Sequence, residues 1–189
     1  MSNNANYVSV GKPMIGGAVF RAPLGTTLPT SATATLNQAF ENMGYISEDG
    51  VTNNNARESE DIKAWGGDTV LSPQTNKTDT FGMTFLEVLN AIVLKAVHGD
   101  TNVDGSIDSG ITVKVNSKEL EAAAWVIDME MTQGVLKRIV IPNGKITEIS
   151  EVSYKDNEAV GYQTTITAFP GSDGDSHKEY IVAADESES

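Results

Sequence analysis

From Ala122 to Pro142 the sequence reads AAAWVIDMEMTQGVLKRIVIP, and we interpret this stretch as one long β-hairpin. Apolar and more polar side chains alternate along its first arm, which is the two-residue period of a strand with one buried face. Gly134 can supply the positive φ of the turn, and Pro142 is expected to end the ladder of the return arm. The apolar side chains of the first arm are Trp125, Ile127, Met129 and Met131. A hairpin alone is not stable in water, so this one must pair with other strands or other subunits.

The composition favours an acidic, β-rich protein. The chain has 189 residues, enough for one domain with a proper core, and a formal net charge of −13. That charge argues against ordinary nucleic-acid binding and against attachment to an anionic membrane, because both depend on basic surfaces. There are no cysteines, which fits a reducing cytoplasm or an assembly that needs no disulfides. The most apolar stretch, residues 85–97, is too short to span a bilayer and is interrupted by polar residues.

The remaining patterns predict a mainly β fold, which we expect to be a β-sandwich with the hairpin 122–142 at its centre. About eight to ten strands are expected, including two short ones around Gly66-Gly67 within residues 62–71. One α-helix is expected over about residues 85–98. Thr84 and Glu87 match a capping box at its start, and Gly99 is placed to end it.

Four segments are expected to lie outside the sheet. Residues 47–61 are polar and rich in turn formers, which predicts a long loop, and Asn143-Gly144 is the strongest short turn signal in the chain. Residues 1–40 carry only two charges but several apolar side chains, which indicates an extended arm and loop that pack on a neighbouring subunit. We therefore expect this arm, a single β-sandwich domain over residues 41–183, and an acidic flexible tail over residues 184–189.

One loop resembles a calcium site. Oxygen-bearing side chains stand at positions 1, 3, 5 and 9 of an EF-hand-like spacing, with a glycine at position 6. These candidate metal ligands are Asp100, Asn102, Asp104 and Asp108. Position 12 is Ile111 where a bidentate Glu belongs, and a strand is expected to follow, so the pattern favours an ordinary polar loop built from turn-forming residues. It supports one alternative function, a calcium-stabilised β-sandwich binding or adhesion module.

No catalytic set stands out in the sequence. The two histidines have no nucleophile motif beside them, so we expect no enzyme and no cofactor. Abundant carboxylates and two tryptophans leave a carbohydrate-active β-sandwich enzyme as a further alternative.

Over nearly its whole length the chain resembles the major tail protein, or tail tube protein, of long non-contractile-tailed bacteriophages. The similar stretches are residues 44–50, 62–69, 79–99, 125–128 and 136–169. The resemblance implies a β-sandwich flanked by one helix, assembled as hexameric rings that stack into a hollow tube. It also implies a place in the virion tail, assembly in the host cytoplasm, and contacts with tape-measure and tail terminator or tip proteins. DNA would pass through the tube without specific binding.

A closed ring gives two residues of the central hairpin a possible role. If Trp125 and Ile127 face the core, alternation places Asp128 and Glu130 on the opposite face. That face can look into the channel of the tube, where six copies would form acidic rings, or it can be an outer, solvated face. The sequence does not decide between the channel and the outer face for Asp128 and Glu130.

Overall fold

The computed structural model describes residues 3–183, so the predicted acidic tail 184–189 lies outside the described residues. The strands are β1 (Gly11–Pro13), β2 (Val19–Pro23), β3 (Glu41–Asn42), β4 (Ile46–Ser59), β5 (Ile62–Lys63), β6 (Thr69–Leu71), β7 (Gln74–Phe85), β8 (Val103–Ser106), β9 (Gly110–Val113), β10 (Ala123–Met131), β11 (Leu136–Ile149), β12 (Tyr162–Ala168) and β13 (Lys178–Val182). The helical elements are α1 (Ala91–His98) and the short 3₁₀ helices Ala5–Tyr7, Asp100–Asn102 and Thr132–Gly134. The prediction of a mainly β chain with one α-helix is confirmed for this part of the chain.

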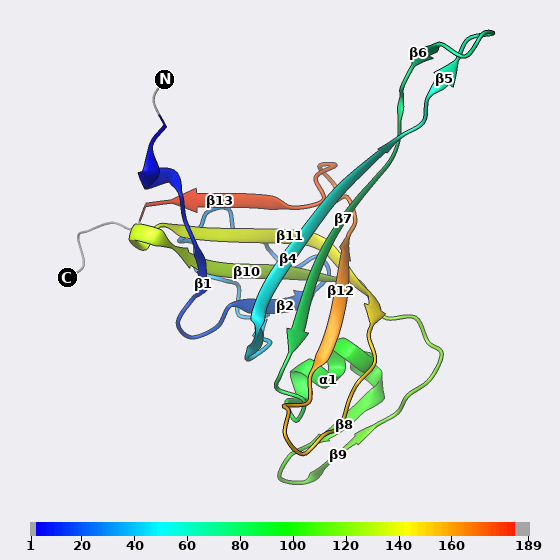
Figure 1. The fold of residues 1–189 in the computed structure, drawn as a ribbon. Coiled ribbons are helices and arrows are strands. Elements are labelled where there is room, and N and C mark those ends of the chain that lie inside the picture. The colour runs from blue at the N-terminus through cyan, green and yellow to red at the C-terminus, as the bar shows by residue number, and fades with distance from the viewer. Residues whose placement is uncertain (1–2, 184–189) are drawn as a thin grey trace.

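The predicted central hairpin is confirmed as β10 and β11, and it lies in the middle of a large antiparallel sheet (Figure 1). The sheet order is β3-β2-β10-β11-β12-β7-β4, with β1 paired to the end of β10 and β13 paired to the start of β11. The turn between the hairpin arms is a 3₁₀ turn in which Gln133 and Gly134 both have positive φ, 64° and 71°. Gly134 therefore has the turn role that the sequence predicted.

β11 runs through the point where the sequence predicted its end. Pro142 and the Asn143-Gly144 pair lie inside the strand, so both predictions, the end of the ladder and the tight turn, are wrong. Before Pro142 the strand pairs with β13, and from Gly144 onward it pairs with β12. Pro142 cannot donate a backbone hydrogen bond, and Gly144 has no side chain, so this short stretch suits a bend better than a straight ladder.

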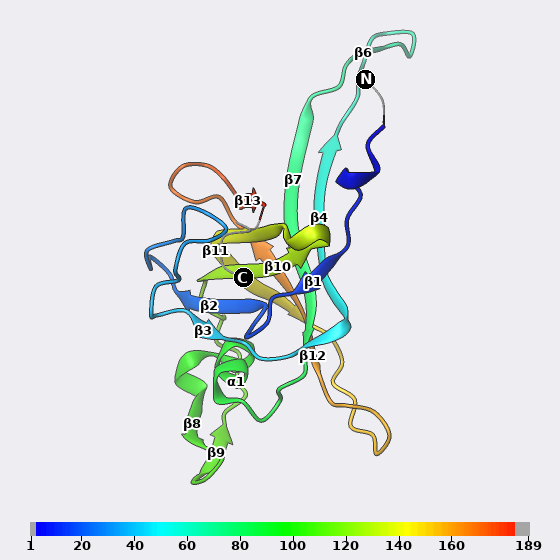
Figure 2. The ribbon, with the colours of Figure 1, turned by 90° about the vertical axis from the view of Figure 1, so that its left-hand side faces the viewer.

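The bend in β11 divides the sheet into two crossing layers. β4, β7 and β12 cross over β2, β10, β11 and β13 (Figure 1), and in the view turned by 90° β4 and β7 run to one side of β2 and β10 (Figure 2). Orthogonal layers joined by a bent strand are a known way to enclose a β core. The arrangement is consistent with the predicted sandwich.

The main core fills the space between the layers and extends onto α1, which packs near one end of both. Its largest fully buried side chains are Trp125, Phe81, Phe85, Met43, Ile127, Ile141 and Ile166. The Trp125 indole N–H donates to the Gly144 carbonyl oxygen at 3.1 Å. A side chain on Gly144 would lie 2.6 Å from Trp125, so the corner of β11 requires a glycine for packing.

A smaller core lies on the other face of β10. Ala124 and Val126 are fully buried there with Ala22, under the segment 24–40, which contributes Leu28, Leu36 and Phe40. Val19, in β2, has no exposed surface and belongs to the main core. The first 40 residues therefore supply strands and a covering segment to this same body, as well as loops.

The helix is shorter than predicted and starts later. Thr84 and Phe85 continue the alternation of β7, so the predicted capping box is wrong. Asn90 caps the helix instead, its side-chain oxygen accepting from the Ile92 N–H at 2.9 Å. Glu87 accepts from the Tyr45 N–H at 3.1 Å. The predicted helix end at Gly99 is confirmed, with φ of 100° and an N–H donated to the Lys95 carbonyl.

Candidate assembly surfaces

The predicted polar loop 47–61 is not a loop. Residues 46–59 form β4, a long strand paired antiparallel with β7 as far as Ser59 and Gln74. β-propensity is weak in this segment because its side chains are polar, but a backbone ladder along a partner strand does not need an apolar face. The two short strands predicted around Gly66-Gly67 are confirmed as β5 and β6, which continue the hairpin outward.

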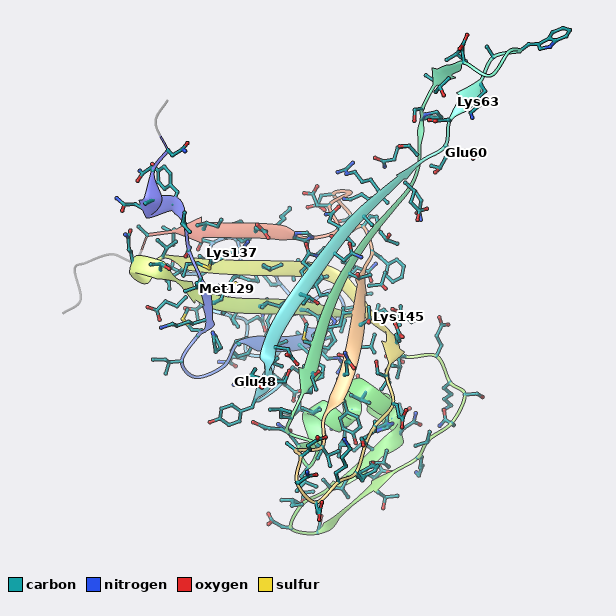
Figure 3. The ribbon with its side chains drawn as sticks, in the orientation of Figure 1. Glu48, Glu60, Lys63, Met129, Lys137 and Lys145 are labelled. Atoms are coloured by element: carbon teal, nitrogen blue, oxygen red, sulfur yellow. The ribbon has the colours of Figure 1, made fainter. Side chains whose placement is uncertain are left out.

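The outer part of this hairpin stands free of the body. Every residue from 57 to 78 is exposed, and we call this segment the hairpin arm. The arm projects away from the two layers and carries β5 and β6 near its end (Figures 1 and 2). Figure 3 shows Glu60 and Lys63 on the arm, far from labelled residues of the body such as Met129 and Lys137. No other described part of the chain covers the arm.

The end of the arm carries four exposed apolar side chains among polar ones. Its exposed apolar side chains, which we call the arm tip, are Ile62, Trp65, Val70 and Leu71. Trp65 is fully exposed, and the other three each expose half or more of their surface. Exposed apolar clusters on soluble proteins typically mark interaction sites. The sequence gives a partial signal for this, since four apolar residues stand within a strongly polar stretch.

The base of the arm is anchored by a buried carboxylate. Asp79 in β7 is 2% exposed and lies 2.5 Å from the His177 ring Nδ1. Its other oxygen accepts from the Asn53 side-chain amide at 2.9 Å. His177 also contacts the edge of the Phe81 ring, with centroids 5.2 Å apart. These contacts tie β4, β7 and the segment before β13 together, so the arm leaves the body in a defined direction.

Two long edges of the sheet are open in the described residues. β4 pairs with β7 alone, and β13 pairs with β11 alone. β13 also exposes Ile181 and Val182. An open edge offers unpaired backbone groups to another strand, so both edges are candidate contacts between copies.

A shallow apolar cleft lies beside the corner of β11. It has a volume of about 310 Å³, and its apolar lining comes from Leu24, Leu28, Pro142 and Pro170. Asn143 and Ser172 add polar atoms to the lining. We call this the corner cleft. Its residues come from three separate segments that only the bend of β11 brings together.

Asp128 does not present a free carboxylate. It is 5% exposed and forms a two-pronged ion pair with Arg138, which is 6% exposed, at 2.6 and 2.8 Å. Arg138 also donates to the backbone carbonyls of Ser31 and Ala34, which cover the pair. Glu130 lies two residues further on the same face, half-buried and opposite Lys12 of β1.

Three of the four predicted calcium ligands are engaged by other protein groups. Asp100 forms a two-pronged pair with Arg21, and Asp104 pairs with Lys114 at 3.1 Å. Asn102 is buried, donating to the His98 carbonyl and accepting from Asn116. Asp108 lies in the turn between β8 and β9. Within residues 3–183 no three acidic or histidine side chains are grouped closely enough to hold a metal ion. The geometry therefore gives no support to the calcium-stabilised alternative.

No helix in the described part of the chain is long and apolar enough to cross a membrane. Among curated proteins, no sequence matches the chain. Two solved structures are similar in outline, each aligned over 97% of this chain and 100% of the other. One is the tube terminating cap of the anti-feeding prophage, with 11% identity and a TM-score of 0.45. The other comes from the sheath–tube complex of an extracellular contractile injection system, PVC, with 8% identity and a TM-score of 0.44.

The sequence profile of one protein family covers almost the entire chain. It is described as "Phage tail tube protein", and it matches residues 1–188. The match includes the segments that build the two layers, the hairpin arm and the corner cleft, and it confirms the family that the sequence resemblance indicated. The chain therefore belongs to the phage tail tube protein family.

Proposed function

We propose that this protein assembles as hexameric rings that stack into the phage tail tube, a conduit through which DNA is ejected. The tail tube family is a structural one, so the chain is a tail component and not an enzyme. The observation that carries the assembly proposal is the hairpin arm, a long exposed segment with an apolar tip that its own chain does not cover. The number six comes from the family resemblance.

The open sheet edges support a ring. β4 and β13 have one partner strand each in the described residues. If an edge of one copy pairs with a different edge of the next, the contact is heterologous, and it closes into a ring when the rotation between copies allows. Closure also removes the exposed edges, which are otherwise sites of uncontrolled aggregation.

The charge of the chain suits a passive conduit. Six copies at −13 each give a ring with a formal charge of −78. Where acidic side chains of this excess line the channel, they repel the phosphates of DNA, and the channel guides DNA without holding it. We propose Glu130 as a lumen-facing carboxylate. Asp128, the other candidate, is compensated by Arg138 beneath residues 31–34 and contributes no net charge by itself.

The proposed partners follow from this role. They are further copies of the chain, in the ring and between rings, together with tape-measure and tail terminator or tip proteins by family resemblance. We propose the virion tail as the location, after assembly in the cytoplasm of the bacterial host. No cofactor is part of the proposal.

Electron microscopy of the purified chain tests the assembly directly. We expect hollow tubes or rings in negative stain, with six subunits in averaged end views. A sample that stays monomeric by light scattering at every concentration and salt condition tested would contradict the assembly proposal. Rings with another number of subunits would correct the hexamer but leave the tube in place.

A further inference from the structure

The two tryptophans of the chain have opposite environments. Trp125 is 1% exposed and lies in the main core, whereas Trp65 at the arm tip has no covered surface at all. Tryptophan is highly buried on average in folded proteins, and at interfaces it is among the residues that contribute most binding energy. Trp65 is flanked by the exposed apolar side chains of Ile62, Val70 and Leu71. The arm tip thus has the character of an interface anchor without its partner.

The described part of the chain offers Trp65 no partner. Asp79 is the last buried residue at the base of the arm, and Asn55 lies opposite it on the partner strand. Trp65 comes ten residues after Asn55 in the sequence. At about 3.3 Å per residue, the tip lies roughly 30 Å beyond that base. The ladder between β4 and β7 continues to Ser59, so the arm is a paired ribbon, and its course leads away from the body (Figure 1). It does not fold back onto its own chain.

The corner cleft has the size and chemistry to accept one aromatic side chain. Its volume of about 310 Å³ is at the small end of the range for binding pockets, roughly 300–1,000 Å³. Leu24, Leu28 and the rings of Pro142 and Pro170 give it an apolar surface. Asn143 and Ser172, residues with side-chain oxygens, also line it, and a buried indole N–H needs such an acceptor.

We propose that Trp65 of one copy inserts into the corner cleft of the next copy. The proposal rests on the assembly described above and names the contact that the hairpin arm makes. Each chain carries both the projecting side chain and the receiving cleft, at different places on its surface. Such a contact is heterologous and continues from copy to copy, as a tube requires. A single tape-measure or tip protein would occupy few of the many arms, whereas another copy of the chain is present at every position.

Tryptophan quenching tests whether Trp65 becomes buried on assembly. In the unassembled chain, acrylamide should quench the emission of Trp65 and spare that of Trp125. In tubes of the same protein, the quenchable fraction should disappear. The Trp65→Phe variant is the control, since its only remaining tryptophan is buried in both states. If the quenchable fraction persists in tubes that form normally, the inference is wrong and the assembly proposal stands. If wild-type protein forms no tubes at all, the assembly proposal itself fails.

Cysteine cross-linking tests which surface receives the tip. The natural chain has no cysteine, so every disulfide comes from the introduced pair. Ala64→Cys, beside an intact Trp65, combined with Ser172→Cys in the cleft should give a ladder of dimers, trimers and longer species on oxidation. Ala64→Cys with Asp108→Cys, on the distant β8–β9 turn, is the matched control and should give no ladder. The assignment of the cleft would be overturned if only the control pair gave a ladder, or if tubes formed and neither pair gave one.

Trp65→Ser tests the energetic importance of the contact. Loss of an interface anchor typically costs at least about 2 kcal/mol, so the concentration needed for assembly should rise roughly 30-fold or more. Thr69→Ser, an exposed position in β6, is the matched control and should assemble at the wild-type concentration. Assembly of Trp65→Ser at the wild-type concentration would contradict the proposal.

Discussion

Replacing Asp128 by Asn should destabilise the folded monomer strongly. The substitution keeps the shape of the side chain but removes the charge that compensates Arg138, a residue that is 6% exposed. The carboxylate accepts two hydrogen bonds from Arg138, at 2.6 and 2.8 Å, in directly opposed positions of β10 and β11. Removing one partner of a buried pair leaves an uncompensated charge and typically costs about 3–5 kcal/mol.

That cost is large compared with the stability of a domain, which is about 5–15 kcal/mol in total. With a urea dependence of about 2 kcal/mol per molar, the unfolding midpoint of Asp128→Asn should fall by roughly 1.5–2.5 M. Urea unfolding followed by circular dichroism and by Trp125 emission measures the shift.

Glu130→Gln is the matched control for this experiment. Glu130 lies on the same strand and the same face but is only half-buried. Its loss of charge should change the free energy of unfolding by less than about 0.5 kcal/mol. If Asp128→Asn changes stability as little as Glu130→Gln does, the ion pair is not structural and Asp128 returns as an equal candidate for the lumen.

Four further outcomes are expected. Gly144→Ala places a methyl group 2.6 Å from Trp125, which should cost about 1–3 kcal/mol in urea unfolding, and an unchanged midpoint would contradict the packing argument. Replacing residues 58–76 by Asn-Gly keeps the cross-strand pair Arg57–Lys77. This variant should melt at the wild-type temperature but form no tubes, and normal tube formation would show that assembly does not need the arm. Deleting residues 1–9 should leave a folded body, but deleting residues 1–20 removes the buried Val19 and should unfold it; a cooperative melt of the longer deletion would refute this. Burial lowers the pKa of His98, so around and below about pH 6.5 the unfolded state binds more protons than the folded state, and stability decreases as the pH is lowered. Wild type should therefore lose more stability than His98→Phe between pH 7.5 and 5.5, and equal losses would exclude this contribution.

The buried face of a strand could be predicted from the sequence where that face is apolar and the other is more polar. Trp125 and Ile127 in β10 lie in the main core, as their period of two indicated. The same alternation did not reveal that Val126 and Asp128 are buried as well. Their cover, residues 24–40, is far away in the sequence and contains small polar residues, so no local pattern marks it as a layer over the sheet. Burial on the second face is decided by tertiary contacts alone.

The corner of β11 and the length of β4 could not be predicted for a related reason. Pro142 and Asn143-Gly144 have the local chemistry of a turn, but Gly144 is required by the approach of Trp125 and sits at a bend within a strand. Residues 46–59 have the local chemistry of a loop, but they are held by the backbone of β7. In both cases a partner distant in the sequence outweighs local propensity.

The β4–β7 hairpin separates folding from assembly along a single pair of strands. Its inner part supplies Phe81, Met83 and Phe85 to the main core, and Asp79 closes that region with a buried contact to His177. Beyond Asp79 the side chains of β7 are exposed until Gln74, and the arm contributes nothing to the core. Substitutions at the inner positions must therefore act on the stability of the monomer, whereas those at the arm tip act on the affinity between copies. Because the two sets share one continuous ladder, the rigidity of the folded body fixes the direction in which the arm tip is presented to its neighbour.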